Sequence, residues 1–419
     1  MIDVGAINRA LENCPCGRPH RIDFRALEIS RGNTADSGRI LRDASFPKRL
    51  HAVYDGNTVR AAAGVLDAIA EAGFIISHTS YENLTVAAAE EAQRVKSDLL
   101  ANGAEGIVSI GTGSLNDICR LTAAELGIPF AIIATAPSMD GFASVMAPIT
   151  VNGFKRTLPA KCPEVIIADT EVLAASPDEL KAAGLGDLLG KYTALADWEI
   201  ARITTGEYYC ESIASLTRDA VDRAVSIARY GNSSDPEYGS AIMDALVLSG
   251  LAMLLSGCTR PASGAEHHLS HFWEMKYLMQ GKEPLYHGKK VGIATGMVAD
   301  VYAELAKLNS VRERRRVLDE AELAGVFGPM WKEARAENFP NPLEKVPDGA
   351  VEKNWQAIRA AYASVPSGDD IRALLRAAGG EATCAEAGIS PELEAEGLKY
   401  GKYARFRITG MRLTDMMNI

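Results

Sequence analysis

The chain has 419 residues, 47% of them apolar, and its 44 Lys and Arg against 54 Asp and Glu give a net charge of −10. This length exceeds what one hydrophobic core usually spans, so we expect two domains, each with enough apolar side chains for a core. The acidic balance, without a large Lys/Arg cluster, excludes nucleic acid as an expected partner.

The first residues, MIDVGAINRALENCPCG, lack the basic stretch and apolar run of an export signal, and no segment reaches the roughly 18 uninterrupted apolar residues of a membrane span. We therefore expect a cytoplasmic protein without a membrane span. Seven cysteines fit a reducing compartment better than a disulfide framework. Cys14, Cys16 and His20 are zinc-ligand types, but C-x-C is tighter than the usual C-x2-C and a fourth ligand is missing nearby, which disfavours zinc.

Short apolar runs alternate with segments of helical period between Arg49 and Ala136, as in βαβ units with a parallel sheet. The expected strands are 50–54, 74–77, 107–110 and 130–134, with a late strand at 165–168, and the expected helices are 59–72, 86–101 and 114–126. After Ala175 the pattern is almost entirely helical, beginning with Ser176 as a capping residue and proline at the first helical position. The sequence thus predicts a Rossmann-like α/β domain over residues 1–175 and an all-α domain over 176–419, the latter split by a proline-rich loop at 338–348.

A glycine-rich turn, Gly111-Thr-Gly113-Ser114-Leu-Asn-Asp117, follows the third predicted strand and precedes a helix. Glycines let backbone N–H groups approach a pyrophosphate, and the helix N-terminus favours its charge, although a tight turn uses glycine for steric reasons too. We therefore predict a cofactor phosphate site there.

Asp55 ends the first strand predicted in this alternating region, at the sheet edge where dinucleotides lie. Its carboxylate is predicted either to accept hydrogen bonds from a cofactor ribose, which would favour NAD over NADP, or only to cap the next helix. The loop after the fourth strand carries Thr135, Ser138, Asp140 and Ser144, whose short polar side chains suit contacts to cofactor and substrate.

Three histidines lie within five residues in Gly264-Ala-Glu-His267-His268-Leu-Ser-His271, and His267 and His271 share one face of the predicted helix. His287 opens a later small-residue helix, and Asp187 lies among glycines and leucines, where a charge needs a partner. Two imidazoles and a carboxylate are a ligand set for a catalytic divalent metal, whereas any one histidine alone would be a core or surface residue.

Taken in order, these motifs resemble the iron-containing alcohol dehydrogenase and dehydroquinate synthase superfamily, and within it the sn-glycerol-1-phosphate dehydrogenases of the bacterial AraM type. The resemblance lies in the glycine-rich turn and in three sequence segments, PSMDGFAS, GLGDLLGKYTALADW and SGAEHHLSHFWEM. The resemblance implies a dehydroquinate synthase-like fold, with the site in the cleft between a Rossmann-like domain and a helical domain.

The resemblance further implies NAD(P) as cofactor and one zinc or nickel ion held by Asp187, His267 and His287. It implies cofactor contacts from the glycine-rich turn and from Thr135, Ser138 and Ser144, with Asp140 and His271 facing the substrate. One departure is Thr112, where glycine is commoner, which requires an ordinary backbone angle at that position. Lys155 and Lys191 are candidate phosphate ligands, but the sequence favours solvated lysines.

The implied reaction is hydride transfer between the nicotinamide and C2 of dihydroxyacetone phosphate, giving sn-glycerol 1-phosphate, in a homodimer or higher homo-oligomer. One alternative is a dehydrogenase of an unphosphorylated polyol such as glycerol, whose pocket would lack cations. Another alternative is a cyclase like 3-dehydroquinate synthase. A third is a binding protein that has lost catalysis, but the presence of all the expected metal ligands argues against it.

Overall fold

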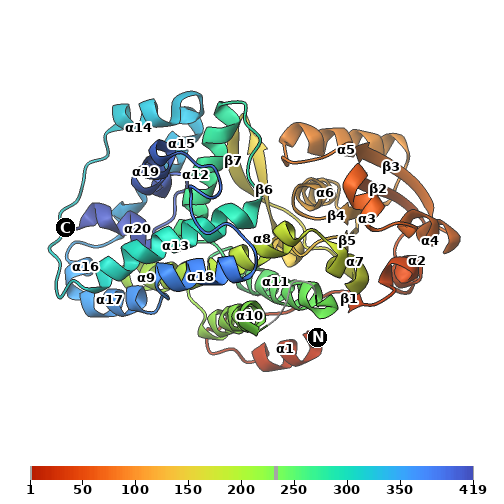
Figure 1. Cartoon of the computed structure of the whole chain (residues 1–419), viewed down its shortest axis with the longest axis horizontal. Helices are drawn as coiled ribbons and strands as arrows, with labels where there is room; N and C mark the ends of the chain where they lie inside the picture. The colour runs from red at the N-terminus through yellow and green to blue at the C-terminus, as the bar shows by residue number, and fades with distance from the viewer. Residues whose placement is uncertain (1, 231–234, 419) are drawn as a thin grey trace.

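A computed structural model describes residues 2–230 and 235–418 of the chain. A sheet with flanking helices forms one side of the molecule, and a larger helical part forms the other (Figure 1). The N-terminus lies near the boundary of the two parts, whereas the C-terminus lies at the far end of the helical part. The predicted order, α/β first and all-α second, is confirmed.

The main sheet has six parallel strands in the order β1-β8-β5-β4-β2-β3. In chain order they are β1 (Ala26–Ser30), β2 (Arg49–Asp55), β3 (Ile75–Tyr81), β4 (Gly106–Gly111), β5 (Phe130–Ala134) and β8 (Val165–Asp169). The central strands β4, β5 and β8 are buried along their whole length, as expected of a parallel sheet covered on both faces. The edge strand β1, only half-buried, was not predicted.

Helices cover both faces of the sheet. They are α2 (Asn33–Asp43), α3 (Gly56–Ala61), α4 (Val65–Glu71), α5 (Ala89–Ala101) and α6 (Gly113–Leu126). Apolar side chains of α2 and α4 form one core with one face of the sheet, and those of α5 and α6 join another core with the opposite face. The single helix predicted over 59–72 is wrong, because Gly64 adopts φ +85°, outside the helical region, and separates α3 from α4.

A two-stranded antiparallel sheet, β6 (Met146–Val151) and β7 (Phe154–Pro159), lies between the two parts and was not predicted. Asn152 and Gly153 connect the strands with φ of 52° and 77°. Two consecutive left-handed residues match the twist of a hairpin, and Asn-Gly is a strong sequence signal for such a turn. The hairpin carries Lys155 towards the helical part.

The helical part follows β8 directly. After the N-terminal α1 (Val4–Leu11), the remaining helices in chain order are α7 (Thr170–Ala175), α8 (Asp178–Leu189), α9 (Lys191–Thr205), α10 (Glu211–Tyr230), α11 (Pro236–Ser256), α12 (Ala265–Met279), α13 (His287–Ala306), α14 (Glu320–Phe327), α15 (Trp331–Asn338), α16 (Ala350–Lys353), α17 (Trp355–Ala363), α18 (Gly368–Ala377), α19 (Pro391–Tyr400) and α20 (Gly410–Leu413). A short 3-10 turn, Pro342–Lys345, lies within the predicted proline-rich loop.

The predicted cap of the first helix after the boundary is wrong. Helix α8 begins at Asp178, one residue later than expected, without a side-chain cap. The Ser176 hydroxyl instead donates to the carbonyl of Leu173 and closes the end of α7. Serine serves either end of a helix, so the sequence S-P-D-E did not distinguish the stop from the start.

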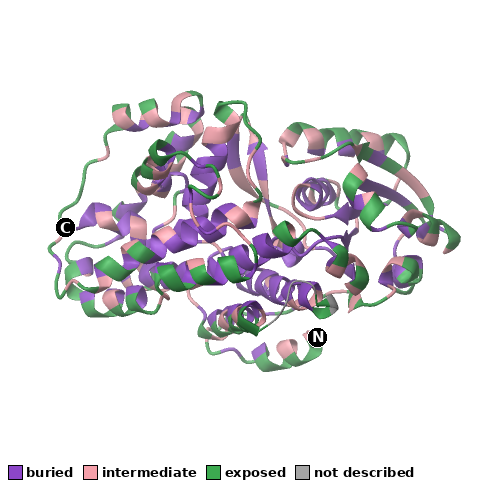
Figure 2. Cartoon of the chain, in the orientation of Figure 1, coloured by how far each residue is buried: buried purple, intermediate pink, exposed green. Residues whose placement is uncertain are grey.

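Burial is continuous through the middle of the molecule, where α8, α11 and α12 lie (Figure 2). Residues Glu237–Ser256 of α11 are long and apolar enough for a membrane span, but 78% of this window is buried inside the fold. The burial of α11 is typical of a core helix.

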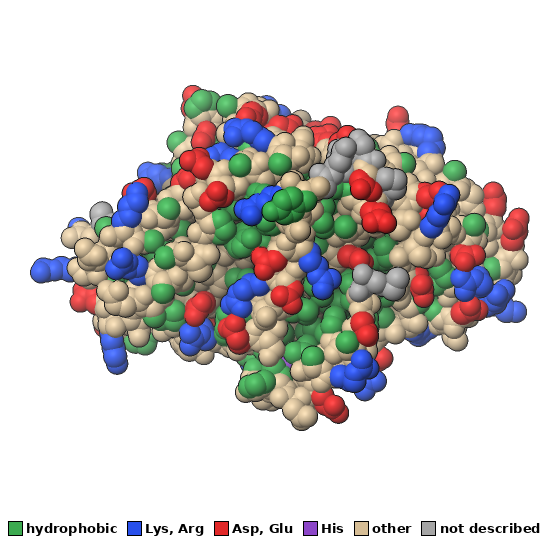
Figure 3. Space-filling model, turned by 60° about the horizontal axis from the view of Figure 1, so that its bottom comes forward, with side chains coloured by type: hydrophobic (Ala, Val, Ile, Leu, Met, Phe, Trp, Pro, Cys, Tyr) green, Lys and Arg blue, Asp and Glu red, His purple; other side chains and the backbone are tan. Residues whose placement is uncertain are grey.

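On the side that carries α1 and α10, acidic and basic side chains are interspersed around apolar areas (Figure 3).

Helices α8 and α13 approach each other at backbone contact. A Cβ atom on Gly288 would overlap the carbonyl oxygen of Ala183, and one on Gly186 would overlap the carbonyl oxygen of Gly288. A Cβ on Gly292 would lie 2.9 Å from the Cα of Gly186. Glycine is required where two backbones come this close. This contact brings the end of α8, with Asp187, beside the start of α13.

We expect Gly288→Ala to lower the stability by about 3 kcal/mol, because the new methyl group must push α13 away from α8. Metal retention should fall with it, since the helices would separate at the predicted ligands. Gly296→Ala is the matched control on the same helix, where a Cβ would make ordinary contacts at 3.5 Å with Arg372. Thermal unfolding and metal content measure both effects, and equal behaviour of the two variants would contradict the role assigned to the close approach.

Candidate functional site

A cleft of about 580 Å³ runs between the sheet edge, the β6–β7 hairpin and helices α12 and α13. Its wall includes most of the residues that the sequence indicated: Asp55, Gly113, Ser114, Asp117, Ser138, Asp140, Ser144, His267, His271 and His287. Gly111, Thr135 and Asp187 are buried behind this wall. The cofactor motifs and the histidines, far apart in sequence, thus meet at one cleft.

Asp187, His267 and His287 each place one ligand atom within 4.8 Å of the other two. His267 Nε2 lies 3.6 Å from Asp187 Oδ1, and His287 Nε2 lies 3.9 Å from Asp187 Oδ2. A tetrahedral ion with bonds of about 2.1 Å sets neighbouring ligand atoms about 3.4 Å apart, so the observed separations fit a divalent metal. A small inward movement of each side chain would complete the site.

Burial holds the imidazole of His287 in the neutral form that a metal requires. Burial lowers the pKa of His287 and of His271 well below the ordinary value, and the neighbouring His267 lowers both further. The rings of His267 and His287 have centroids 5.2 Å apart, and His271 lies about 6 Å from each. Neutral rings keep a free lone pair, which is what ligation needs.

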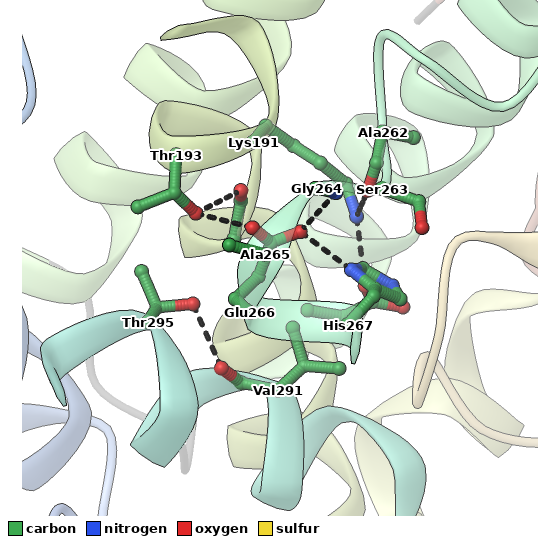
Figure 4. Close-up of polar contacts among 12 residues, drawn as sticks. Lys191, Thr193, Ala262, Ser263, Gly264, Ala265, Glu266, His267, Val291 and Thr295 are labelled. Carbon is green, nitrogen blue, oxygen red and sulfur yellow. Dashed lines mark hydrogen bonds and ion pairs between the residues drawn. The ribbon is translucent and has the colours of Figure 1, made fainter. Parts of the chain in front are cut away.

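Glu266, which the sequence analysis did not single out, orients His267. Its carboxylate accepts hydrogen bonds from His267 Nδ1 at 2.7 Å, from the Thr193 hydroxyl at 2.5 Å and from the Gly264 N–H at 2.7 Å (Figure 4). Burial alone would raise the pKa of Glu266, but these donors lower it. The proton on Nδ1 leaves Nε2 free towards Asp187, as in carboxylate–histidine–metal arrangements.

Lys191 is fully buried and contacts both carboxylates of the site, which corrects the expectation of a solvated lysine. Its Nζ lies 2.7 Å from Asp187 Oδ1 and 2.8 Å from Asp140 Oδ2, and it also donates to the Ala262 carbonyl. Burial would lower its pKa, but the two carboxylates raise it above the ordinary value. Lys191 therefore pairs with Asp140 and Asp187 and offsets part of their charge, rather than binding a phosphate.

Asp140 links the loop that follows β5 to the buried charges of Asp187 and Lys191. Its N–H donates to Asp187 Oδ2 at 2.9 Å, and its carboxylate accepts from the Ser249 hydroxyl at 3.0 Å. His271 faces the cleft, and its Nδ1 has no partner among the residues that the structure describes. A substrate bound in the cleft would therefore lie beside the His271 ring.

At the glycine-rich turn, Gly113 has φ +38°, and Thr112 is extended with φ −146°, as its side chain requires. The Thr112 hydroxyl lies 2.7 Å from that of Ser138 on the next loop. Burial raises the pKa of Asp117 to about 6, although Arg120 opposes the shift. The turn opens α6, where free N–H groups favour an anion.

Asp55 caps α3, which is one of the two roles predicted for it. Its Oδ1 accepts from the N–H groups of Asn57 and Thr58 at 2.9 Å, and Thr58 completes a capping box. Asp55 also lies on the cleft wall, so a ribose contact stays a prediction.

The fold and the cleft are those of a dehydroquinate synthase-like enzyme, and comparisons with known proteins identify it as a dehydrogenase. A model of the family "Iron-containing alcohol dehydrogenase" matches residues 28–177. The chain is 32% identical to "Glycerol-1-phosphate dehydrogenase [NAD(P)+]" of Bacillus licheniformis, over 99% of this chain and 95% of the relative. It is 37% identical to the protein of the same name from Bacillus velezensis, over 87% and 84% of the two chains.

The fold also matches solved structures. A probable glycerol dehydrogenase from Sinorhizobium meliloti aligns with a TM-score of 0.60 at 19% identity, over 94% of this chain and 92% of that one. A sulfoacetaldehyde reductase from Bifidobacterium kashiwanohense, in complex with NAD+, aligns with a TM-score of 0.61 at 15% identity, over 94% and 95%. The chain belongs to the glycerol-1-phosphate dehydrogenase family of the iron-containing alcohol dehydrogenases.

We expect Glu266→Gln to weaken the binding of the activating metal about 10- to 100-fold, because the amide loses the charge that holds His267. Activity of the metal-free protein, restored at buffered free zinc concentrations, gives the apparent dissociation constant. Glu199→Gln on α9, an acid paired with Arg202 at the surface, is the control and should match the wild type. An unchanged zinc dependence in Glu266→Gln would remove Glu266 from this role.

Proposed function

We propose that this chain is a metal-dependent NAD(P)-linked dehydrogenase that interconverts dihydroxyacetone phosphate and sn-glycerol 1-phosphate. The observation that supports a phosphorylated substrate is a pair of buried lysines, which lie in the same cleft as the predicted metal ligands. The family supports the reaction type, NAD(P) as cofactor and a divalent metal, and zinc or nickel is the finer proposal.

The two lysines lie on either side of one carboxylate. Lys155 Nζ is 3.0 Å from Glu274 Oε1, and Lys290 Nζ is 2.7 Å from Glu274 Oε2. All three residues are at most 8% exposed and line the cleft. Burial would raise the pKa of Glu274, but the two ammonium groups lower it. Two cations share one anion here, which leaves positive charge for a substrate phosphate.

The position of this group fits a short phosphorylated substrate. Glu274 lies three residues after His271 on α12, and Lys290 lies three residues after His287 on α13. Residues three apart share a helix face. Lys290 therefore lies about one helical turn, or about 5 Å, along the cleft from the predicted ligand His287, a span that a three-carbon phosphate ester covers.

A divalent metal held by Asp187, His267 and His287 would polarise the substrate C2–O bond and stabilise negative charge on the oxygen, with the hydride supplied by NAD(P)H. The glycine-rich turn would hold the cofactor pyrophosphate, and Asp55, Thr135, Ser138 and Ser144 would position the rest of the cofactor. His271 would contact the substrate and relay a proton from water to its C2 oxygen, accepting one proton on one ring nitrogen as it gives one from the other. Asp140, held by Lys191, orients the substrate beside the nicotinamide.

The reaction is tested by NADH and NADPH oxidation with purified protein and either dihydroxyacetone phosphate or dihydroxyacetone. We expect turnover of the phosphorylated acceptor, loss after chelation, and recovery with zinc or nickel. Turnover of dihydroxyacetone alone would instead identify a glycerol dehydrogenase. Absence of turnover with both would leave the cyclase or a non-catalytic protein, and chiral analysis of the product checks the enantiomer.

We expect Lys155→Met to raise KM for dihydroxyacetone phosphate about 10- to 100-fold, because a hydrogen bond between charged groups is lost. Binding of NADH, followed by fluorescence, should not change. Lys289→Met is the matched control, since Lys289 also lines the cleft but contacts Glu179 and Glu381. If both variants raised KM equally, the phosphate would not be held by Lys155.

A further inference from the structure

Four side chains of metal-binding type meet at a second place, outside the catalytic cleft. Cys14, Cys16, His20 and Cys210 each offer one ligand atom, and the four atoms all lie within 4.8 Å of one another. The first three follow α1, whereas Cys210 immediately precedes α10, some 190 residues later. The sequence disfavoured a zinc site because C-x-C is tighter than the usual spacing and because a fourth ligand was not nearby, and the fold supplies that fourth ligand.

The separations fit a tetrahedral site. Cys14 Sγ lies 3.4 Å from Cys210 Sγ, Cys16 Sγ lies 3.0 Å from His20 Nε2, and Cys210 Sγ lies 3.7 Å from His20 Nε2. Bonds of about 2.3 Å to sulfur and 2.0 Å to nitrogen around one ion set neighbouring ligand atoms about 3.5 to 3.8 Å apart. The observed separations lie within about 0.5 Å of these values, so small movements of the side chains would admit one ion.

The surroundings prepare the ligands for a cation. His20 Nδ1 lies 2.7 Å from the carbonyl oxygen of Leu255 in α11. Because a carbonyl only accepts, Nδ1 carries the proton, and Nε2 of the neutral ring presents its lone pair to the cysteines. Backbone N–H groups of Arg18 and Ile213 donate to the sulfurs of Cys16 and Cys210, so both sulfurs are held in place.

We propose that these four residues bind one structural Zn²⁺ ion in a Cys3His site. Thiolates select soft ions, and a set of three sulfurs and one imidazole leaves no position open for a substrate. A disulfide between Cys14 and Cys210 is the competing arrangement. Its sulfurs would have to be about 2.05 Å apart, and it would leave Cys16 and His20 facing each other without a function.

The ion would link two segments that lie far apart in the sequence and have no covalent bond between them. Residues 14–20 lead from α1 to β1, the edge strand of the main sheet, while Cys210 and Leu255 belong to the helical part. Zinc at this position would fasten the start of the Rossmann-like part to α10 and α11. Its contribution is to stability rather than to the chemistry of the cleft.

The test is metal analysis of the full-length protein after dialysis against zinc-buffered solution. We expect about two zinc ions per wild-type chain and about one in Asp187→Ala/His267→Ala. Cys16→Ser/Cys210→Ser should also hold about one, with a lowered thermal midpoint. Cobalt replacement should give sulfur-to-cobalt charge-transfer absorption in wild type and in Asp187→Ala/His267→Ala, but not in Cys16→Ser/Cys210→Ser.

Cys258→Ser, at a partly buried cysteine outside the cluster, is the control and should keep both ions and the absorption band. Thiol titration of wild type, denatured with chelator present, should find all seven cysteines free. The proposal is overturned if wild type lacks the thiolate band. A titration that finds five thiols, showing a disulfide, would overturn it too, even if a variant failed to fold.

Discussion

The close approach of α8 and α13 is the contact on which the catalytic cleft depends. Gly288 lies against the backbone of Ala183, and Gly186 against that of Gly288, so any side chain there would force the helices apart. Asp187 and His287 are the immediate neighbours of these glycines. A carboxylate on one helix and an imidazole on another thus face each other because of the small residues beside them, which explains why the ligands occur in glycine-rich sequence.

Bringing Asp187 to a fully buried position carries an electrostatic cost that the site itself compensates. Lys191, one turn further along the same chain, lies between Asp187 and Asp140, so two anions and one cation are buried together. A divalent metal would reverse the remaining negative charge of the cluster. The cluster therefore keeps one excess negative charge, which favours the binding of a cation.

The parts of the structure that could be predicted were those where one local pattern decides the outcome. β5 is a continuous apolar run buried on both faces, and its predicted bounds agree with the structure. β1 was missed because an edge strand is only half-buried and lacks such a run. In the site, histidine spacing identified His267, but no local pattern assigns Glu266 its three hydrogen bonds or brings Cys210 to Cys14, since both depend on tertiary contacts.

The buried group of Lys155, Glu274 and Lys290 explains how the cleft would favour a phosphorylated substrate over an unphosphorylated one. Glu274 keeps two lysines paired and ordered in the absence of phosphate, which avoids burying unpaired ammonium groups. Arg405, also buried, donates to the Lys155 carbonyl, and its Nη2 lacks a partner among the described residues. A phosphate would therefore enter a region whose positive charge exceeds that of its one carboxylate. A neutral polyol would gain nothing from this excess, so discrimination arises from charge already held in place.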